Sequence, residues 1–206
     1  MAENVNCKLC RREGMKLFLK GERCNMAKCP VERQKSKPGA RGFRRRKLSA
    51  YAVQLREKQK LKRLYDLREK QFKNIVMKAV RKKGVTGDVL LQLLETRLDN
   101  LVCRLGLSPS KSGARQMVSH GHILVNGRKV DIPSCTIKAG DVIGVKDAPR
   151  SRHIAERAFR VTEKKEMPAW LRLDRKNFRG ELVRNPTRDE IEVPVSMNLI
   201  VEYYSK

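Results

Sequence analysis

Four cysteines near the amino terminus have the spacing of a metal site. Cys7 and Cys10 are separated by two residues and Cys24 and Cys29 by four, with thirteen residues between the pairs. Two such pairs supply four thiolates, a ligand set that closes a tetrahedral zinc site and leaves no position for water or substrate. The spacing therefore predicts a structural zinc ion bound by Cys7, Cys10, Cys24 and Cys29.

Two other interpretations of these cysteines remain open. The spacing alone does not separate zinc from an iron–sulfur cluster, and four reduced thiols in a flexible basic arm would show the same pattern. Zinc is favoured because the segment has little besides Leu17, Phe18 and Leu19 to bury, so a bound ion would have to supply its folding energy. Cys103 and Cys135 lie among apolar residues and are predicted to be core side chains.

The elements around this segment are strongly basic. The 206 residues contain 48 Lys or Arg and 22 Asp or Glu, a formal net charge of +26. Between Lys37 and Lys83 there are 18 Lys or Arg and three acids. Such a field favours a polyanionic partner, and nucleic acid fits better than a merely solvated helix face, on which the signs usually mix.

The apolar spacing predicts helices first and strands afterwards. One helix, capped by Ser49, is expected to continue through Lys83, and a second runs from Asp88 to the Gly106 stop. A shorter helix follows between Ser110 and Gly121. Asn126 and Gly127 then predict a two-residue hairpin turn, and residues 136–146 predict two further strands.

The remainder of the chain is expected to continue with a helix over residues 152–160 and a strand near residues 181–183. The closing LIVEYYSK reads as an apolar strand that folds back on earlier elements. No apolar run has the length of a signal peptide or a membrane span, so a reducing cytoplasmic location without a membrane partner is expected, and disulfides are not.

No enzyme signature is present. Phosphate-binding glycine loops, H-E-x-x-H and G-x-S-x-G are all absent from the sequence. The three histidines, His120, His122 and His153, have no acidic or metal-binding residues near them at a spacing typical of a metal site or an acid–base pair. Catalysis is therefore not expected.

Residues 97–143, RLDNLVCRLGLSPSKSGARQMVSHGHILVNGRKVDIPSCTIKAGDVI, resemble the small RNA-binding module named after ribosomal protein S-four. The flanking RRRKLSAYAVQLREKQKLKRLYDLREKQF, the closing LIVEYYSK and the initial RREGMKLFLKGERC extend the likeness over essentially the whole chain. The chain thus resembles the bacterial small-subunit ribosomal protein S-four family in its zinc-binding, four-cysteine version.

The resemblance and the patterning together predict an α+β fold in three parts. Residues 1–45 form a zinc knuckle and basic arm, and residues 46–92 form a basic helical domain onto which residues 185–206 fold back. Residues 93–184 form the RNA-binding module, two helices plus antiparallel strands, with a strand extension.

The resemblance also implies a function. Members of the family are structural, primary assembly proteins that bind the five-prime domain of small-subunit ribosomal RNA. They lie where messenger RNA enters the subunit and influence translational accuracy with the neighbouring ribosomal protein S-five. No homo-oligomer is expected.

By position, three groups of residues match RNA-binding segments of the family. The first is the arm close to the messenger, the second is the helical segment facing an RNA junction, and the third is the module's helices and hairpin. They are Arg44, Arg45, Arg46 and Lys47; Arg56, Lys58, Lys60, Lys62 and Arg63; and Arg97, Lys111, Arg115, Gln116, His120, Asn126 and Arg128.

Three rival functions use the same features differently. A free RNA chaperone or ribosome-rescue factor would carry the same module but associate with ribosomes only partially. An RNA-modifying enzyme would need a catalytic domain for which the chain has no room. A DNA-binding zinc protein would need base-reading residues on a helix beside the cysteines, and none has a recognisable spacing.

Overall fold

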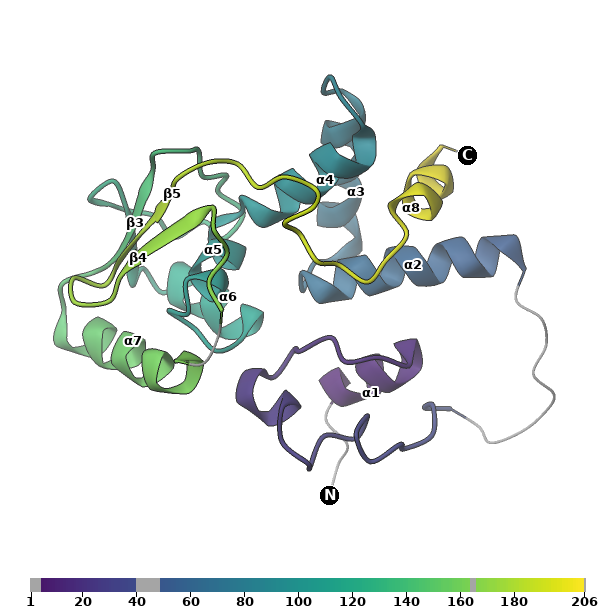
Figure 1. Ribbon diagram of the computed structural model, residues 1–206, viewed down its shortest axis with the longest axis horizontal. Coiled ribbons are helices and arrows are strands. Elements are labelled where there is room, and N and C mark those ends of the chain that lie inside the picture. Colours follow the sequence, from purple (N-terminus) through teal and green to yellow (C-terminus); the bar gives the residue numbers. More distant parts are fainter. Residues whose placement is uncertain (1–4, 40–48, 164–165, 206) are drawn as a thin grey trace. The chain divides into compact units, whose positions relative to one another are not determined.

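The computed structural model describes residues 5–39, 49–163 and 166–205. These residues fall into two compact units: the described residues up to 81 together with 193–205 form one, and those between 82 and 192 form the other (Figure 1). The predicted RNA contacts Arg44, Arg45, Arg46 and Lys47 lie outside the described residues. Among the described helices, none is both long and apolar enough to cross a membrane.

The first unit is helical. Its elements are α1 (Val5–Glu13), the short 3-10 helix η1 (Gly21–Cys24), α2 (Ala50–Leu64), α3 (Glu69–Val80) and α8 (Met197–Tyr204). Ser49 caps α2 as predicted, its hydroxyl accepting a hydrogen bond from the Ala52 amide at 3.2 Å.

The single long helix predicted from Ser49 to Lys83 is wrong, because the chain turns between α2 and α3. The Leu67 amide donates to the Lys62 carbonyl at 3.0 Å, and the Asp66 amide donates to the Arg63 carbonyl at 3.1 Å. This pair of bonds is the Schellman helix ending, with Asp66 at the left-handed position (φ 51°) that glycine usually fills. No glycine or proline marks this position in the sequence, so the end of the helix could not be predicted from it.

The carboxyl-terminal segment is also not the predicted strand. Residues 197–204 form α8, in which Met197 and Ile200 are buried, and α8 packs against α2. The Gln54 side chain of α2 donates to the Glu202 carboxylate at 3.0 Å, and the Ser196 amide donates to Glu57 at 3.0 Å. A short apolar run does not distinguish strand from helix, and here packing on α2 decides.

The second unit is a five-stranded antiparallel sheet with helices. Strands β1 (Ile123–Val125), β2 (Arg128–Lys129), β3 (Val142–Val145), β4 (Leu171–Asp174) and β5 (Arg179–Leu182) are ordered β2-β1-β3-β5-β4. The helices are α4 (Thr86–Glu95), α5 (Leu98–Arg104), α6 (Lys111–Ser119) and α7 (Pro149–Thr162). The hairpin at Asn126 and Gly127 is confirmed, and both residues have positive φ, 50° and 79°.

The helix predicted from Asp88 to Leu105 is broken into α4 and α5. Between them Arg97 forms an antiparallel bridge with Thr136, and the Leu98 amide donates to the Cys135 carbonyl at 2.9 Å. The chain therefore exchanges helical hydrogen bonds for bonds to the loop of residues 133–137. The segment that begins at Thr136 was predicted to be a strand, but it forms only this single bridge to Arg97.

The core of the second unit lies between its helices and its sheet. Sixteen buried side chains form one cluster, among them Leu98 and Leu101 of α5, Ile123 of β1 and Trp170. Cys103 is buried in it and Cys135 packs against it, as predicted. Packing is close: a Cβ at Gly180 of β5 would lie 2.5 Å from the nearest methyl of Leu105, so any larger residue there would displace this fully buried leucine.

Candidate nucleic-acid interface and metal centre

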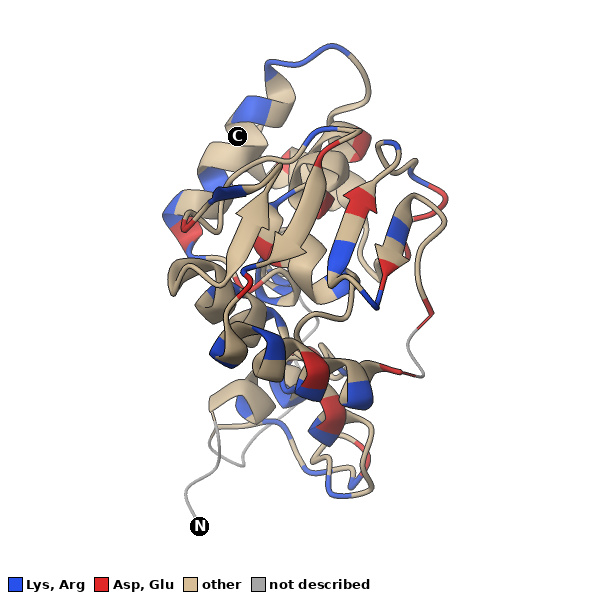
Figure 2. Cartoon of the chain, turned by 90° about the vertical axis from the view of Figure 1, so that its left-hand side faces the viewer, with Lys and Arg blue, Asp and Glu red and all other residues tan. Residues whose placement is uncertain are grey.

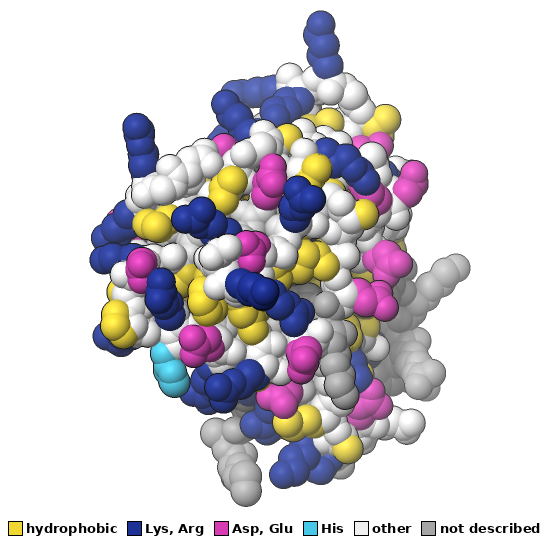
Figure 3. All heavy atoms as spheres, turned by 60° about the vertical axis from the view of Figure 1, so that its left-hand side comes forward, with side chains coloured by type: hydrophobic (Ala, Val, Ile, Leu, Met, Phe, Trp, Pro, Cys, Tyr) yellow, Lys and Arg dark blue, Asp and Glu magenta, His cyan; other side chains and the backbone are white. Residues whose placement is uncertain are grey.

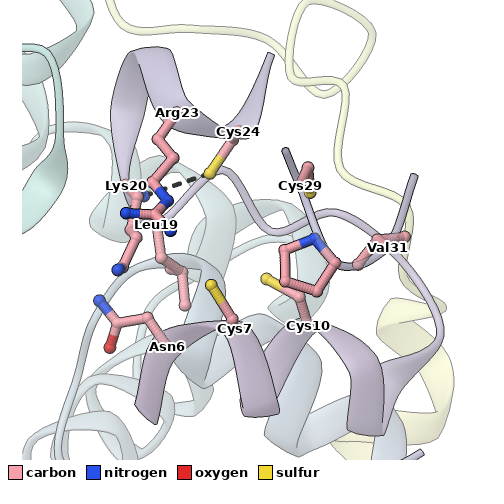
Figure 4. A pocket seen from close by; sticks show the side chains of 10 residues that line it. Asn6, Cys7, Cys10, Leu19, Lys20, Arg23, Cys24, Cys29 and Val31 are labelled. Atoms are coloured by element: carbon pink, nitrogen blue, oxygen red, sulfur yellow. Dashed lines mark hydrogen bonds between the residues drawn. The ribbon is translucent and has the colours of Figure 1, made fainter. Parts of the chain in front are cut away.

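The four amino-terminal cysteines line one cavity. Cys7 and Cys10 lie one turn apart on α1 and point toward the segment that carries Cys24, at the end of η1, and Cys29 (Figure 4). The rest of the lining combines apolar side chains with polar and basic ones: Leu19, Pro30, Val31, Asn6, Lys20 and Arg23. The cavity has a volume of about 20 Å³, enough for one water-sized sphere.

Burial shapes the chemistry of these thiols. Cys10, Cys24 and Cys29 are buried and Cys7 is half-buried, and the described residues contain no disulfide. Burial raises the pKa of Cys10, against the hydrogen bond from the Leu17 backbone, and its three cysteine neighbours raise the pKa further. The Lys20 amide donates to Cys24 Sγ at 3.4 Å. In the described part of the chain, no group of three or more His, Cys, Asp or Glu side chains is arranged so that it could hold a metal ion. The zinc site therefore remains a prediction.

Glu13 connects the cysteine segment to the basic helix α2. Its side chain is only 1% exposed, and one carboxylate oxygen, Oε1, accepts hydrogen bonds from both Arg56 (3.3 Å) and Arg63. The second oxygen, Oε2, is buried without a hydrogen-bond partner. Because Glu13 follows Cys10 by one turn of α1, the helix that carries two of the cysteines also fixes two predicted RNA-binding arginines.

Glu69 plays a similar role at the start of α3. Its carboxylate accepts bonds from Lys58 (2.5 Å), Lys62 (2.8 Å) and the Tyr204 hydroxyl (3.1 Å). Burial would raise the pKa of Glu69, but the bonds from the two lysines outweigh it and lower the pKa to about 2. Lys60 pairs with Glu57 one turn earlier on α2. All five α2 cations predicted to contact RNA thus have a carboxylate partner within the unit.

In the RNA-binding module, Arg97 is held inside the fold. Its side chain is 5% exposed and forms two hydrogen bonds to the Asp99 carboxylate, at 3.0 and 2.6 Å. A second carboxylate, the fully buried Glu95, accepts two bonds from Arg104, at 3.1 and 2.7 Å, and one from Asn100 at 2.6 Å. These two ion pairs stabilise the turn between α4 and α5, which precedes the predicted RNA-binding residues of α6 and the hairpin.

Helix α6 carries three of the predicted RNA contacts, Lys111, Arg115 and Gln116, and begins at Ser110, whose hydroxyl accepts from the Gly113 amide at 3.2 Å. Lys111 is half-buried, and burial lowers the pKa of its amine to about 8, with Glu95 acting in the opposite direction. With a pKa of about 8, the Lys111 amine still carries its positive charge for most of the time at neutral pH.

The remaining predicted contacts lie at the end of α6 and on the hairpin. His120 follows α6 and is exposed, as is Arg128 on β2. Asn126 has a structural task, because its side chain donates to Asp141 at 2.8 Å and accepts from the Val142 amide at 2.9 Å. The fold thus brings together α6 and the β1–β2 hairpin, which both pack on one core.

Cations are spread along the chain and are interspersed with acids. Lys and Arg occur on helices, strands and loops (Figure 2). On the face shown in Figure 3, their side chains alternate with Asp and Glu, with apolar side chains between them. The cations on this face are therefore separated by acids, whereas more than half of the chain's positive excess lies between residues 37 and 83, where 18 Lys or Arg occur with three acids.

Glu13 and Glu69 were not among the residues predicted to form the site, although each pairs with two predicted RNA-binding cations. For Glu13 a signal was available, since Cys10-x-x-Glu13 places the acid one helical turn from a cysteine. For Glu69 none was, because its pairing with Lys58 depends on the turn between α2 and α3.

Comparison with known families agrees with a two-part ribosomal RNA-binding protein. Residues 3–95 match the family model described as "Ribosomal protein S4/S9 N-terminal domain", and residues 96–143 match the one described as "S4 domain". The second match covers α5, α6 and the strands β1 to β3, apart from the last residues of β3.

The chain belongs to the family of small ribosomal subunit protein uS4. It is 52% identical over 200 residues to that protein of Thermoanaerobacter sp. (strain X514), with 97% of this chain and 96% of the relative covered. It is 53% identical over 201 residues to the Dictyoglomus thermophilum protein of the same name, with 98% and 97% covered. These relatives are named as ribosomal proteins, and neither name describes an enzyme.

Proposed function

We propose that this chain is a structural constituent of the small ribosomal subunit, located on the ribosome in the cytoplasm, where it binds ribosomal RNA. The observation that carries the proposal is the likeness to small ribosomal subunit proteins uS4 over nearly the full length of both chains. The finer proposal is a primary assembly protein that binds the five-prime domain of the RNA. It lies where messenger RNA enters the subunit and affects accuracy together with ribosomal protein S-five.

Recognition of RNA by this chain would depend on backbone geometry. The deep, narrow major groove of duplex RNA hides base edges, so side chains at a junction contact phosphates and ribose hydroxyls. Arg115, Gln116, His120 and Arg128 are at least partly exposed and supply donors on α6 and the hairpin. Arginine supplies a planar fork for phosphate, and lysine supplies a point charge.

The ion pairs of α2 would prepare its cations for RNA. A guanidinium has five N–H donors and an ammonium has three, so a bond to Glu13 or Glu69 leaves donors free for phosphate. A side chain already held by a carboxylate loses less conformational entropy when it binds. Arg56 and Arg63 on Glu13, and Lys58 and Lys62 on Glu69, would therefore present a fixed arrangement of charge.

We further propose a structural zinc ion at Cys7, Cys10, Cys24 and Cys29. The support is that the four side chains line one small cavity and form no disulfide. A bound zinc ion would hold four thiolates together and supply folding energy to a segment whose own core is Cys10, Leu17 and Leu19. An iron–sulfur cluster would use the same ligands, and visible absorption with elemental analysis separates the two.

The direct test is binding of the purified chain to a small-subunit ribosomal RNA transcript over a range of salt concentrations. If about 6–10 phosphates are contacted, affinity should fall roughly a thousandfold or more between 50 and 200 mM salt. Retention on small subunits through a moderate-salt wash supports a resident ribosomal protein. Release at low salt would instead indicate a free chaperone or rescue factor, and absence of RNA binding would contradict the proposal altogether.

A further inference from the structure

Phe18 combines an unfavourable backbone with an exposed ring. Its φ is +50°, in the left-handed region that bulky side chains rarely adopt, and the residue is 55% exposed. A backbone conformation of this kind costs free energy that something else must supply, so it marks a position where the surrounding structure imposes the conformation.

The neighbours of Phe18 account for the imposed conformation. Leu17 and Leu19 are 3% and 8% exposed and form the small core of the cysteine segment together with Cys10. Because the side chains of Leu17 and Leu19 both enter this core, the side chain of Phe18 between them is left outside it. The largest apolar side chain of the segment is therefore directed to the surface while smaller ones fill the interior.

Phe178 provides an internal comparison. It has nearly the same φ, +52°, but its ring stacks on Phe159 with centroids 5.8 Å apart and an interplanar angle of 11°, against the core of the second unit. Packing therefore explains the conformation of Phe178. Among the described residues, no aromatic ring pairs with Phe18, and Phe18 is not part of the small core.

The chemical surroundings of Phe18 favour a nucleic-acid partner. Lys16 and Lys20 flank it at two residues on either side, and residues 5–39 contain ten Lys or Arg and three acids. An exposed ring among cations matches sites on single-stranded nucleic acid, where the backbone is held by charge and a base stacks on the ring. A protein partner would more often meet an apolar patch with few charges at its centre.

We propose that Phe18 is a stacking platform for an unpaired base of ribosomal RNA. The ring covers the face of one base displayed at a loop or bulge, and neighbouring cations hold the phosphates on either side. Because every base has a π face, the site selects an unstacked base of any identity. This inference rests on the proposed RNA-binding function and adds a contact that reads an exposed base in addition to the backbone.

The test compares Phe18→Gly with the unchanged chain, each full-length and loaded with zinc, on a small-subunit ribosomal RNA transcript. Glycine accepts the positive φ, so it removes the ring without straining the backbone. Affinity should fall roughly 5- to 100-fold, while the slope of log K against log salt stays the same, because stacking releases no counterions. Phe18→Tyr should bind like the unchanged chain.

Three controls separate stacking from folding and charge. Phe18→Gly should keep the metal content and thermal midpoint of the unchanged chain, whereas Phe178→Gly should lower the midpoint because it removes a packed ring. Lys20→Gln should reduce the salt slope. Met26→Ala, at another exposed apolar residue of the segment (44%), should leave affinity unchanged.

A fluorescence measurement reports on the ring itself. Trp170, the one tryptophan of the chain, is 1% exposed and should respond little to RNA. With Phe18→Trp, stacking on a base should quench the added emission when the transcript is bound.

The possible failures are distinguishable. If the unchanged chain does not bind the transcript, the proposed function fails. If it binds and Phe18→Gly binds equally well with no quenching for Phe18→Trp, only the stacking site is refuted. If RNA affinity is kept but assembly into subunits is lost, the ring contacts a protein, and the inference is overturned in favour of that partner.

Discussion

The cysteine segment and the RNA-binding module differ in the size of the hydrophobic core that stabilises each of them. Residues 5–39 bury a cluster of Cys10, Leu17 and Leu19, with a few partly buried neighbours. The module instead buries sixteen residues between helices and sheet. A core of that size holds itself together, whereas the small cluster of the cysteine segment, even with the buried Cys24 and Cys29, does not offset the conformational entropy of some thirty residues. The four proposed metal ligands lie in the region with the smaller core, so the proposed ion is expected to stabilise that region and not the module.

Removal of the proposed metal should give the largest difference between the two regions. With a chelator, or with Cys7→Ser and Cys10→Ser together, amide hydrogens of residues 5–39 should lose protection by orders of magnitude, while those of α5, α6 and the sheet keep theirs. Hydrogen exchange with mass spectrometry measures both in one sample. RNA affinity should weaken as well. Unchanged protection in the cysteine segment after demonstrated metal loss would contradict a structural ion.

Truncation in the module core should have the opposite distribution. Leu101→Ala removes a fully buried side chain of α5 and should lower the free energy of unfolding of the second unit by about 2–5 kcal/mol. Trp170 lies in this core, so its fluorescence emission during a denaturant titration reports the change in the free energy of unfolding. Zinc content should stay the same. A loss of metal in this variant would show that the regions fold as one cooperative unit.

Removal of the Glu13 carboxylate should affect the connection between the cysteine segment and α2. Glu13→Gln leaves Arg56 and Arg63 without their buried counter-charge, and we expect the first unit to lose about 1–3 kcal/mol. Thermal unfolding measures the loss. The matched control is Glu32→Gln, because the Glu32 carboxylate that pairs with Lys16 is 51% exposed and its loss should cost less stability than the loss of the buried Glu13 carboxylate. Equal effects of the two substitutions would argue against a special role for Glu13.

Removal of the Glu69 carboxylate should produce the smallest effect, a change in how the first unit responds to acid. The pKa of Glu69 is lowered to about 2 from its ordinary 4.5, so its carboxylate stabilises the folded state above the ordinary pKa. That contribution is lost as pH falls from 4.5 toward 2. In Glu69→Gln the stability of the helical unit should therefore decline less steeply over this range. Identical pH profiles by circular dichroism would show that Lys58 and Lys62 do not stabilise the fold through Glu69.

Several elements could be predicted because local sequence decides them. The hairpin at Asn126 and Gly127 follows from a pair of residues that tolerate positive φ, and Ser49 and Ser110 cap α2 and α6 through their own hydroxyls. The apolar neighbours of Cys103 similarly indicated the core. Each of these features depends on residues no more than a few positions apart.

Other features depended on contacts between distant residues. The break before Leu98 is set by bonds to residues 133–137, and α8 forms where its apolar face meets α2. Counts of charged residues likewise could not predict that five cations of α2 pair with Glu13, Glu57 and Glu69. Helical periodicity continues through such points, because it records which residues are apolar and not where the chain turns.

The sequence by itself determined the excess of positive charge, the spacing of four cysteines, two helix caps and the hairpin turn, and with the charge a nucleic-acid partner, which the likeness to the S-four family specified as RNA. Only the tertiary structure decided which carboxylate holds which cation, where the long helices break, and that Phe18 faces outward while its neighbours are buried. The physical reason is range: caps and turns are satisfied within a few residues, whereas burial and ion pairing are settled between segments that meet only after folding.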